Sequence, residues 1–174
     1  MNIQPPSDLP SLHHDSWDRL SRYAFRTGRT LTTQLGWGGE GLVYATDART
    51  AIKSYRHASL YENERNVYFR LRERGVTSVL QFAVPRLIAH DDELLALEMS
   101  IVSPPFILDF AGAYLDKKSP FDNEVMEEWE AERVELFGRR WSEVRRAYYY
   151  FQSFGILLND LKPGNVSFPS DDEE

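Results

Sequence analysis

The sequence predicts an α+β fold in which five antiparallel strands, interrupted by one helix, are followed by a region made mainly of helices. Three observations predict it. Short segments of β-type residues recur between residues 30 and 101, and a single stretch of helical periodicity divides them. The pair Pro104-Pro105 then separates these segments from two amphipathic stretches. Proline cannot donate a hydrogen bond to a sheet, so sheet pairing should stop at this pair.

Residues 1–29 are expected to form an N-terminal extension. Residues 1 to about 14 are punctuated by proline and serine and should be loosely structured. Asp15 begins a short helical or turn segment that runs to about Phe25.

Residues 30–101 should form the first lobe. We expect its strands at 31–35, 41–46, 50–55, about 85–90 and 94–101. The helix between the third and fourth strands runs from 60 to 73 and ends before Gly75. Its periodicity places Val67, Tyr68 and Leu71 on one face.

Residues 102–174 should form a smaller helical lobe. The segment 106–114 is ambiguous between strand and helix. A helix over 124–137 is expected to turn its apolar residues inward, namely Val125, Met126, Trp129 and Leu136. A second helix over 142–154 has Ser142 as its predicted N-cap, and Gly155 ends it. The apolar segment 156–158 then leads into a polar run.

Composition narrows the functional classes. The 174 residues are 42% hydrophobic, which is enough for a buried core. Lys and Arg total 20 against 27 Asp and Glu, so the net charge is −7, which disfavours a nucleic-acid partner bound through its phosphates. The lack of cysteine excludes disulfides, thiolate zinc sites and cysteine nucleophiles. No segment approaches the roughly 18 apolar residues of a membrane span, so we expect a cytoplasmic protein without a membrane partner; no pattern specifies its oligomeric state.

A glycine-rich turn lies between the first two predicted strands. Gly36, Gly38 and Gly41 fit the pattern G-x-G-x-x-G-x-V, with Gly39 inside it and Val43 at its end. Backbone N–H groups can approach nucleotide phosphates closely where the residues have no β-carbon. An ordinary glycine-rich hairpin remains the alternative. A dinucleotide-binding fold is disfavoured because the residues after the turn are β-type and do not open a helix.

Two further motifs follow in order. Ala51-Ile52-Lys53 places a lysine on a predicted interior strand, where it needs an anionic partner. Alone, such a lysine is more often at the surface of an edge strand. The run Asn159-Asp160-Leu161-Lys162-Pro163-Gly164-Asn165 fits the pattern D-L-x-x-x-N, and its alternative is a Pro-Gly turn with incidental polar residues.

With these three motifs in this order, the chain resembles the protein kinase family from about residue 31 to 168. The resemblance implies a protein kinase-like fold, with a five-stranded antiparallel N-lobe sheet, one helix and a reduced helical C-lobe. It implies ATP as the ligand and Mg²⁺ as the cofactor. The cofactor-binding residues that it implies are Gly36, Gly38, Gly39, Gly41, Val43, Ala51, Lys53, Glu64, Glu98 and Ser100.

The resemblance assigns roles within this set. Lys53 would contact phosphates and pair with a helix glutamate. Glu62 and Glu64 are the candidates, and Glu64 is preferred because apolar residues follow it at three, four and seven positions. Lys53 and Glu64 should therefore lie within hydrogen-bonding reach. Residues 98–101 resemble the hinge whose backbone holds adenine, with Leu97 guarding the back of the pocket.

The polar run near the end carries the expected catalytic roles. Asp160 would accept or orient the proton of a substrate hydroxyl, Lys162 would steady the transferring phosphate, and Asn165 would bind magnesium. The resemblance departs from the family here. Leu158 and Asn159 stand at the positions usually held by His and Arg, which argues against control by a phosphorylated activation segment.

The Asp-Phe-Gly motif, whose aspartate normally holds magnesium, occurs nowhere in the sequence. The resemblance therefore stops early. Asp171 or Asp172 is a candidate substitute, although residues 170–174 are more simply interpreted as a frayed acidic tail. Two functions remain open: a phosphotransferase that moves the ATP γ-phosphate to a hydroxyl, and a non-catalytic pseudokinase that serves as a nucleotide-binding module or docks a protein partner.

Overall fold

The computed structural model describes residues 5–108, 110–117 and 123–169. The chain divides into two compact units. Unit 1 contains the residues up to Arg65 together with Pro85–Ile101, and unit 2 contains Asn66–Val84 and the residues from Val102 onward. The domain limits expected at residues 29 and 101 stay predictions, because compactness alone does not define a domain.

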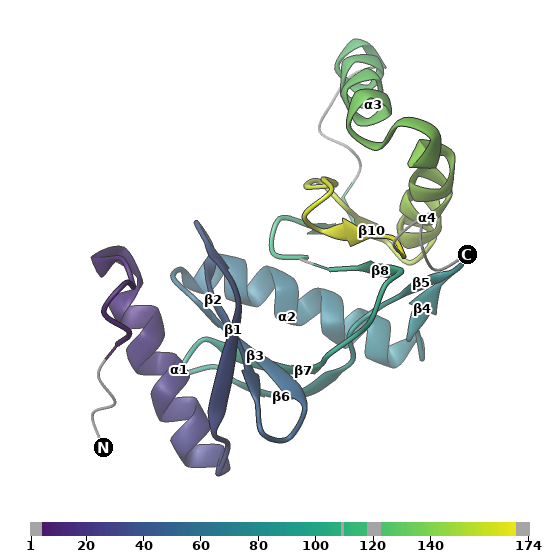
Figure 1. The fold of residues 1–174 in the computed structure, drawn as a ribbon. Helices are drawn as coiled ribbons and strands as arrows, with labels where there is room; N and C mark the ends of the chain where they lie inside the picture. The colour runs from purple at the N-terminus through teal and green to yellow at the C-terminus, as the bar shows by residue number, and fades with distance from the viewer. Residues whose placement is uncertain (1–4, 109, 118–122, 170–174) are drawn as a thin grey trace. The chain divides into compact units, whose positions relative to one another are not determined.

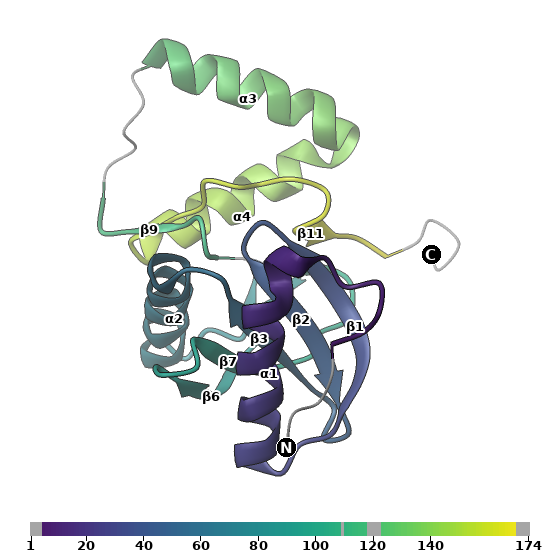
Figure 2. The same ribbon diagram turned by 90° about the vertical axis from the view of Figure 1, so that its left-hand side faces the viewer.

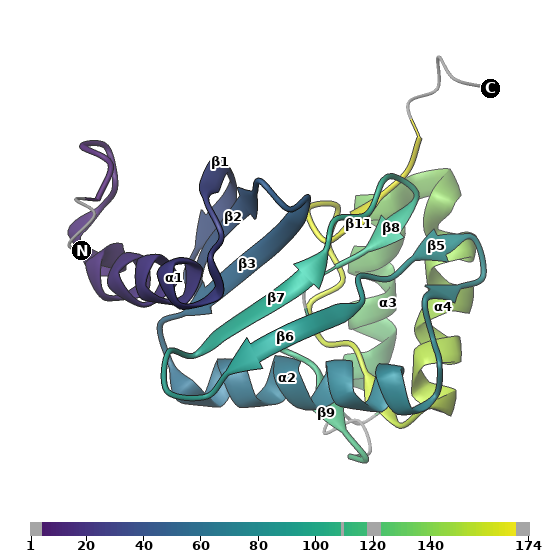
Figure 3. The same cartoon turned by 90° about the horizontal axis from the view of Figure 1, so that it is seen from below.

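Unit 1 is built on a five-stranded antiparallel sheet (Figure 1). Its strands are β1 (Leu31–Gly38), β2 (Gly41–Thr46), β3 (Thr50–Tyr55), β6 (Leu87–Asp91) and β7 (Ala96–Ser100). They lie side by side in the order β1-β2-β3-β7-β6, which Figure 3 shows from below. The predicted five-stranded antiparallel sheet is confirmed, and β2 and β3 have the predicted bounds.

One face of this sheet is covered by α1 (His14–Thr27), which follows a short 3₁₀ turn at Ser11–His13 (Figure 2). The helix begins one residue earlier and ends two residues later than expected, and its C-cap is Gly28, whose φ of 67° is accessible to glycine without strain. The core between helix and sheet is a single cluster: Leu9, Trp17, Leu20, Tyr23, Ala24, Leu42, Tyr44, Ile52, Leu94 and Ala96. The predicted helical segment at Asp15–Phe25 is therefore an integral part of unit 1.

The helix α2 (Ala58–Glu73) begins in unit 1 and ends in unit 2. Its first half packs on the sheet through Tyr61, whose ring centroid lies 5.7 Å from that of Tyr55. Val67, Tyr68 and Leu71 are all buried, as their spacing predicts.

Unit 2 contains two small sheets of two-residue strands. A mixed sheet has the order β11-β8-β5-β4, and a separate antiparallel pair joins β10 and β9. Their bounds are β4 Ser78–Val79, β5 Phe82–Ala83, β8 Phe106–Ile107, β9 Tyr114–Leu115, β10 Ile156–Leu157 and β11 Val166–Ser167. The ambiguous segment 106–114 thus contributes short strands and no helix among its described residues.

Two helices joined by a 3₁₀ turn complete unit 2: α3 (Asn123–Phe137), η2 (Gly138–Arg140) and α4 (Trp141–Ser153). The predicted N-cap is wrong, because Arg140 occupies the cap position of α4 and no side chain bonds there. The inward orientation predicted for Val125 and Leu136 is also wrong, since they are 39% and 47% exposed. Trp129 does pack, against Trp141 and Tyr148 of α4.

Candidate functional site

Lys53 and Glu64 form a buried ion pair in unit 1. Lys53 lies on the central strand β3, and its Nζ atom is 2.8 Å from Oε2 of Glu64 on α2. The side chains are 9% and 1% exposed, so water screens this pair weakly. Glu62, the other candidate, is exposed. The expected proximity of Lys53 and Glu64 is confirmed.

A second carboxylate, which sequence reasoning did not assign, contacts the same lysine. Glu40 lies in the turn between β1 and β2, and its Oε2 atom is 2.9 Å from Nζ of Lys53. The signal for it was an acidic residue inside a glycine-rich hairpin that neighbours the strand of Lys53. One ammonium group therefore faces two carboxylates.

The register of the sheet places small and apolar residues around Lys53. Val43 on β2 and Leu97 on β7 pair directly with Lys53. Side chains two residues apart on one strand share a face, so Ala51 and its partner Met99 lie on that face as well. The sequence-predicted residues Val43 and Ala51 are thus brought to the same side of the sheet as Lys53.

Glu98 lies on the opposite face. It pairs with Ile52, one residue away from the Lys53 pair, and successive side chains in a strand alternate between faces. Its buried carboxylate accepts hydrogen bonds from Tyr23 Oη at 3.2 Å, Arg29 Nε at 2.9 Å and Thr50 Oγ1 at 2.7 Å. Burial, followed by the Glu98 charge, raises the pKa of Tyr23 well above its usual value. Sequence reasoning missed this network.

The backbone groups of the predicted hinge take part in hydrogen bonds within the sheet. Glu98 lies in the middle of β7, which has β3 and β6 as neighbours, so its N–H and C=O point at an adjacent strand. The Ser100 N–H donates to the Arg86 carbonyl at 2.9 Å, and the Ser100 hydroxyl accepts from the Arg86 N–H at 2.9 Å. The adenine-binding role of Glu98 and Ser100 stays a prediction, and Ile101 is the first residue that lies beyond the strand.

The glycines of the β1–β2 hairpin differ in why they are needed: Gly36 and Gly38 lie in β1, Gly39 lies in the turn and Gly41 begins β2. A β-carbon at Gly41 would lie 1.9 Å from the carbonyl oxygen of Ser54, whereas at Gly36, Gly38 or Gly39 it would meet nothing within 4 Å. Gly41 therefore serves the packing of β2 on β3. The other three leave open space around the turn, which is the condition for close approach of a ligand.

The turn is also anchored at its base. Arg56 donates its backbone N–H to the Glu40 carbonyl at 2.8 Å, and its guanidinium donates to the Gly39 carbonyl at 3.2 Å. Trp37 at the other end is 55% exposed, and the ring of the buried His13 meets it edge-on. Burial, assisted by the Arg56 charge, lowers the pKa of His13.

In unit 2, the structure brings together the three polar residues of the predicted catalytic loop. Nζ of Lys162 lies 2.5 Å from Oδ2 of Asp160. The amide of Asn165 donates to the Asp160 carbonyl at 2.9 Å and to its Oδ2 at 3.3 Å. Asp160 and Lys162 are both partly exposed, whereas Asn165 is buried and directly precedes β11. The turn is thus compact, with an accessible carboxylate beside an ammonium group.

The magnesium-binding role of Asn165 stays a prediction. In the described ranges, no group of three or more His, Cys, Asp or Glu side chains could hold a metal. Asn165 uses its amide nitrogen on Asp160, and the predicted substitutes Asp171 and Asp172 lie outside the described residues. No chemical step is assigned to magnesium here.

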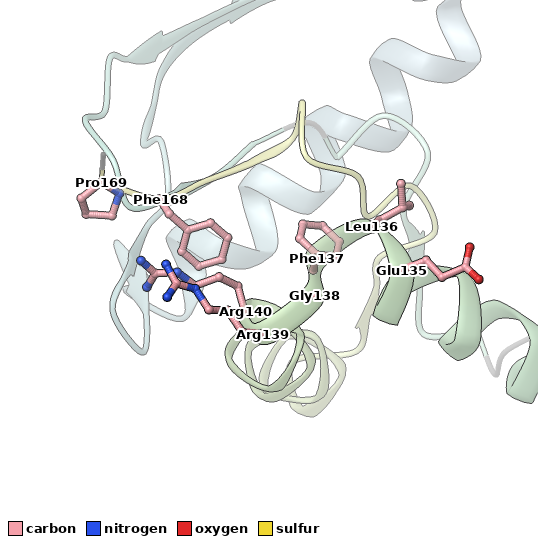
Figure 4. A pocket seen from close by; sticks show the side chains of 8 residues that line it. All are labelled: Glu135, Leu136, Phe137, Gly138, Arg139, Arg140, Phe168 and Pro169. Atoms are coloured by element: carbon pink, nitrogen blue, oxygen red, sulfur yellow. The ribbon is translucent and has the colours of Figure 1, made fainter. Parts of the chain in front are cut away.

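A cavity of about 610 Å³ lies in unit 2, and no sequence-predicted site residue is among its lining residues (Figure 4). It is lined by Glu135, Leu136, Phe137, Gly138, Arg139, Arg140, Phe168 and Pro169. The Arg140 guanidinium lies over the Phe168 ring, 4.9 Å from its centroid, and also pairs with Glu143 at 3.6 Å. The walls of this cavity carry no nucleophile or acid-base pair. We therefore place the candidate chemistry at Lys53 and at Asp160.

No model of a known protein family matches the sequence, and no curated protein matches it. Among the described helices, none combines the length and the apolar character needed to cross a membrane. The functional argument therefore rests on the geometry of the two groups of residues around Lys53 and Asp160.

Proposed function

We propose that this chain is a kinase-like protein that binds ATP on unit 1, at Lys53 and the glycine-rich turn. The observation that carries the proposal is the buried Lys53–Glu64 pair on the central strand and the adjoining helix. Burying an ammonium group is costly unless anions compensate it. Glu64 fixes the position of the lysine, and a phosphate group is an anion that the same ammonium could bind.

Two features around the pair support a nucleotide. A β-carbon at Gly36, Gly38 or Gly39 would meet nothing within 4 Å, so the hairpin has open space there for a phosphate group. Val43, Ala51 and Leu97 are apolar and lie on the same face as Lys53, and Val43 among them is partly exposed. A base needs an apolar surface, and phosphates need the cation and the turn.

The test is ATP binding measured by calorimetry and by thermal unfolding, with and without magnesium. At about 100 times its dissociation constant, ATP should stabilise the protein by about 2.7 kcal/mol. Lys53→Ala should abolish this stabilisation, and Lys117→Ala, which removes an exposed lysine, should leave it intact. An unchanged melting temperature of the unmodified protein at millimolar ATP would overturn the proposal.

Lys53→Ala leaves Glu64 buried without a cation and is therefore expected to be unstable. The double variant Lys53→Met, Glu64→Gln removes both charges and keeps the side-chain volumes. If it folds as judged by circular dichroism, its loss of ATP binding tests the lysine separately from the fold.

A second candidate, phosphoryl transfer, is favoured by the arrangement of Asp160, Lys162 and Asn165. In this step the Asp160 carboxylate takes the proton of a substrate hydroxyl, whose oxygen forms a bond to the γ-phosphorus of ATP. The bond from that phosphorus to the β,γ-bridging oxygen breaks, and ADP leaves. Lys162 would stabilise charge on the transferring group.

Radiolabelled ATP tests this candidate with the chain itself and added hydroxyl-bearing proteins as acceptors. Asp160→Asn should abolish transfer without weakening ATP binding, and Asp18→Asn, at an exposed position on α1, should change neither. Binding without any transfer by the unmodified chain would leave the non-catalytic, pseudokinase function.

A further inference from the structure

We propose that Glu40 is a built-in competitor of the nucleotide phosphates, which holds Lys53 until a ligand displaces it. This inference rests on the proposed ATP-binding function. Its basis is that Lys53 Nζ is held by two carboxylates at nearly equal distances, 2.9 Å for Glu40 and 2.8 Å for Glu64. An ammonium group has three N–H donors, and carboxylates accept from two of them here. A phosphate oxygen that approaches the same cation therefore competes with these two anions.

The two carboxylates differ in how easily they can leave. Glu64 is 1% exposed and lies within α2, where movement would leave a buried charge without a partner. The Glu40 side chain is 29% exposed, and it lies in the turn next to Gly39, between the last residue of β1 and the first residue of β2. Water can solvate Glu40 after it leaves, so the cost of displacing it is much lower.

The anchoring of the turn also allows Glu40 to leave without opening the hairpin. Arg56 bonds the carbonyl groups of Gly39 and Glu40 and does not need the Glu40 carboxylate. The side chain can therefore rotate away while the backbone of the turn stays in place. Displacement is local, and Lys53 keeps its ion pair with Glu64.

The charge of Glu40 should lower the affinity of this site for phosphate groups. With both carboxylates present, the three side chains carry a net charge of −1, which repels an anionic phosphate. Without Glu40 the sum is zero. Competition of this kind acts on the phosphates of a nucleotide and leaves its uncharged base and ribose unaffected, so ATP and adenosine should respond differently.

The experiment compares the dissociation constants of ATP and adenosine for the unmodified chain and for Glu40→Gln, by calorimetry at fixed ionic strength. Glu62→Gln is the matched control, because it removes the same charge from an exposed site on α2. If about one molecule in ten has Glu40 displaced at rest, Glu40→Gln should bind ATP about tenfold more tightly. Adenosine affinity should not change, and Glu62→Gln should behave like the unmodified chain.

The outcomes separate this inference from the function on which it rests. Equal ATP affinity in Glu40→Gln and the unmodified chain overturns the competitor role and leaves ATP binding standing. Weaker ATP binding by Glu40→Gln would show that Glu40 is part of the ligand site, and this result also overturns the competitor role. If neither ATP nor adenosine binds to either chain, the proposed ATP-binding function is overturned, and the competitor role that rests on it is overturned as well. Melting temperatures without ligand verify that the variants remain folded.

Discussion

Arg29 donates a hydrogen bond from Nε to Oε1 of Glu98 over 2.9 Å, and the two residues are 69 positions apart in the chain. Arg29 follows α1, and Glu98 lies inside β7, so the pair joins the N-terminal helix to the interior of the sheet. The Glu98 side chain is 1% exposed, whereas Arg29 is 32% exposed. The buried carboxylate depends on this cation for compensation of its charge.

Replacing Arg29 should therefore destabilise unit 1. Arg29→Met keeps an apolar stem and removes the charge, and we expect the free energy of unfolding to fall by about 2 kcal/mol. Arg22→Met is the control, because Arg22 pairs only with exposed carboxylates in the described structure and should cost less than about 1 kcal/mol. Urea unfolding followed by circular dichroism measures both. Equal losses in the two variants would contradict the assigned role.

The packing of α1 gives a second prediction. Leu20 is fully buried in the core between α1 and the sheet, and Leu12, just before the helix, is 52% exposed. Leu20→Ala should cost about 3 kcal/mol because it leaves a cavity. Leu12→Ala should change stability by no more than about 0.5 kcal/mol. A small effect at Leu20 would show that residues 1–29 are a dispensable extension.

Gly155 supports a third prediction, in unit 2. It has a φ of 75°, and an added β-carbon would lie 2.3 Å from Oδ1 of Asp116 and 2.8 Å from an Arg70 nitrogen. Gly138 also has a positive φ, 52°, but open space around it. Both Gly→Ala changes should cost about 1 kcal/mol for the backbone conformation. Gly155→Ala should cost more in denaturant unfolding, because it also breaks the Arg70–Asp116 bonds; equal costs would contradict the steric argument.

The fourth prediction concerns pH. The Tyr61 hydroxyl, followed by the Arg65 guanidinium, lowers the pKa of Asp92 by bonding its charged form. A carboxyl whose pKa is depressed by folding stabilises the protein above its unfolded pKa of about 3.9, and this contribution is lost as the pH falls through the folded value. The carboxyl titration of Asp92, followed by NMR, should have its midpoint below about 3.9.

Tyr61→Phe provides the comparison for that titration. The change keeps the ring that packs on Tyr55 and removes only the hydroxyl donor. The midpoint of Asp92 should move up toward its ordinary value, and acid unfolding should begin at higher pH. If the midpoint stays where it is, the hydroxyl is not the main cause of the lowered pKa.

Local sequence signals were sufficient for the sheet of unit 1. The bounds of β2 and β3 follow from β-type residues between glycine and turn residues, which need no distant partner to be recognised. Glu64 could be chosen over Glu62 because the apolar residues after it define the buried face of α2, and burial decides which glutamate reaches Lys53.

Features set by distant contacts could not be predicted in the same way. The side chain of Glu98 bonds Arg29 across the α1 face, although only its backbone was considered from the sequence. The two-residue strands of unit 2 exist only through their pairing, and so few residues carry no periodicity. Val125 and Leu136 follow a helical repeat, but a repeat does not show whether a partner covers them.

The carbonyl of Ser54 occupies the place that a β-carbon at Gly41 would need, whereas the other glycines of the turn have no such neighbour. Selection for folding and selection for binding should therefore leave different marks on a randomised library of residues 36–41. Survivors chosen only for resistance to proteolysis should keep glycine at position 41 and vary at 36, 38 and 39. Survivors chosen on immobilised ATP should regain glycine at those three positions. A preference for glycine that arises only under selection for ATP binding would show that the ligand, and not the fold, requires it there.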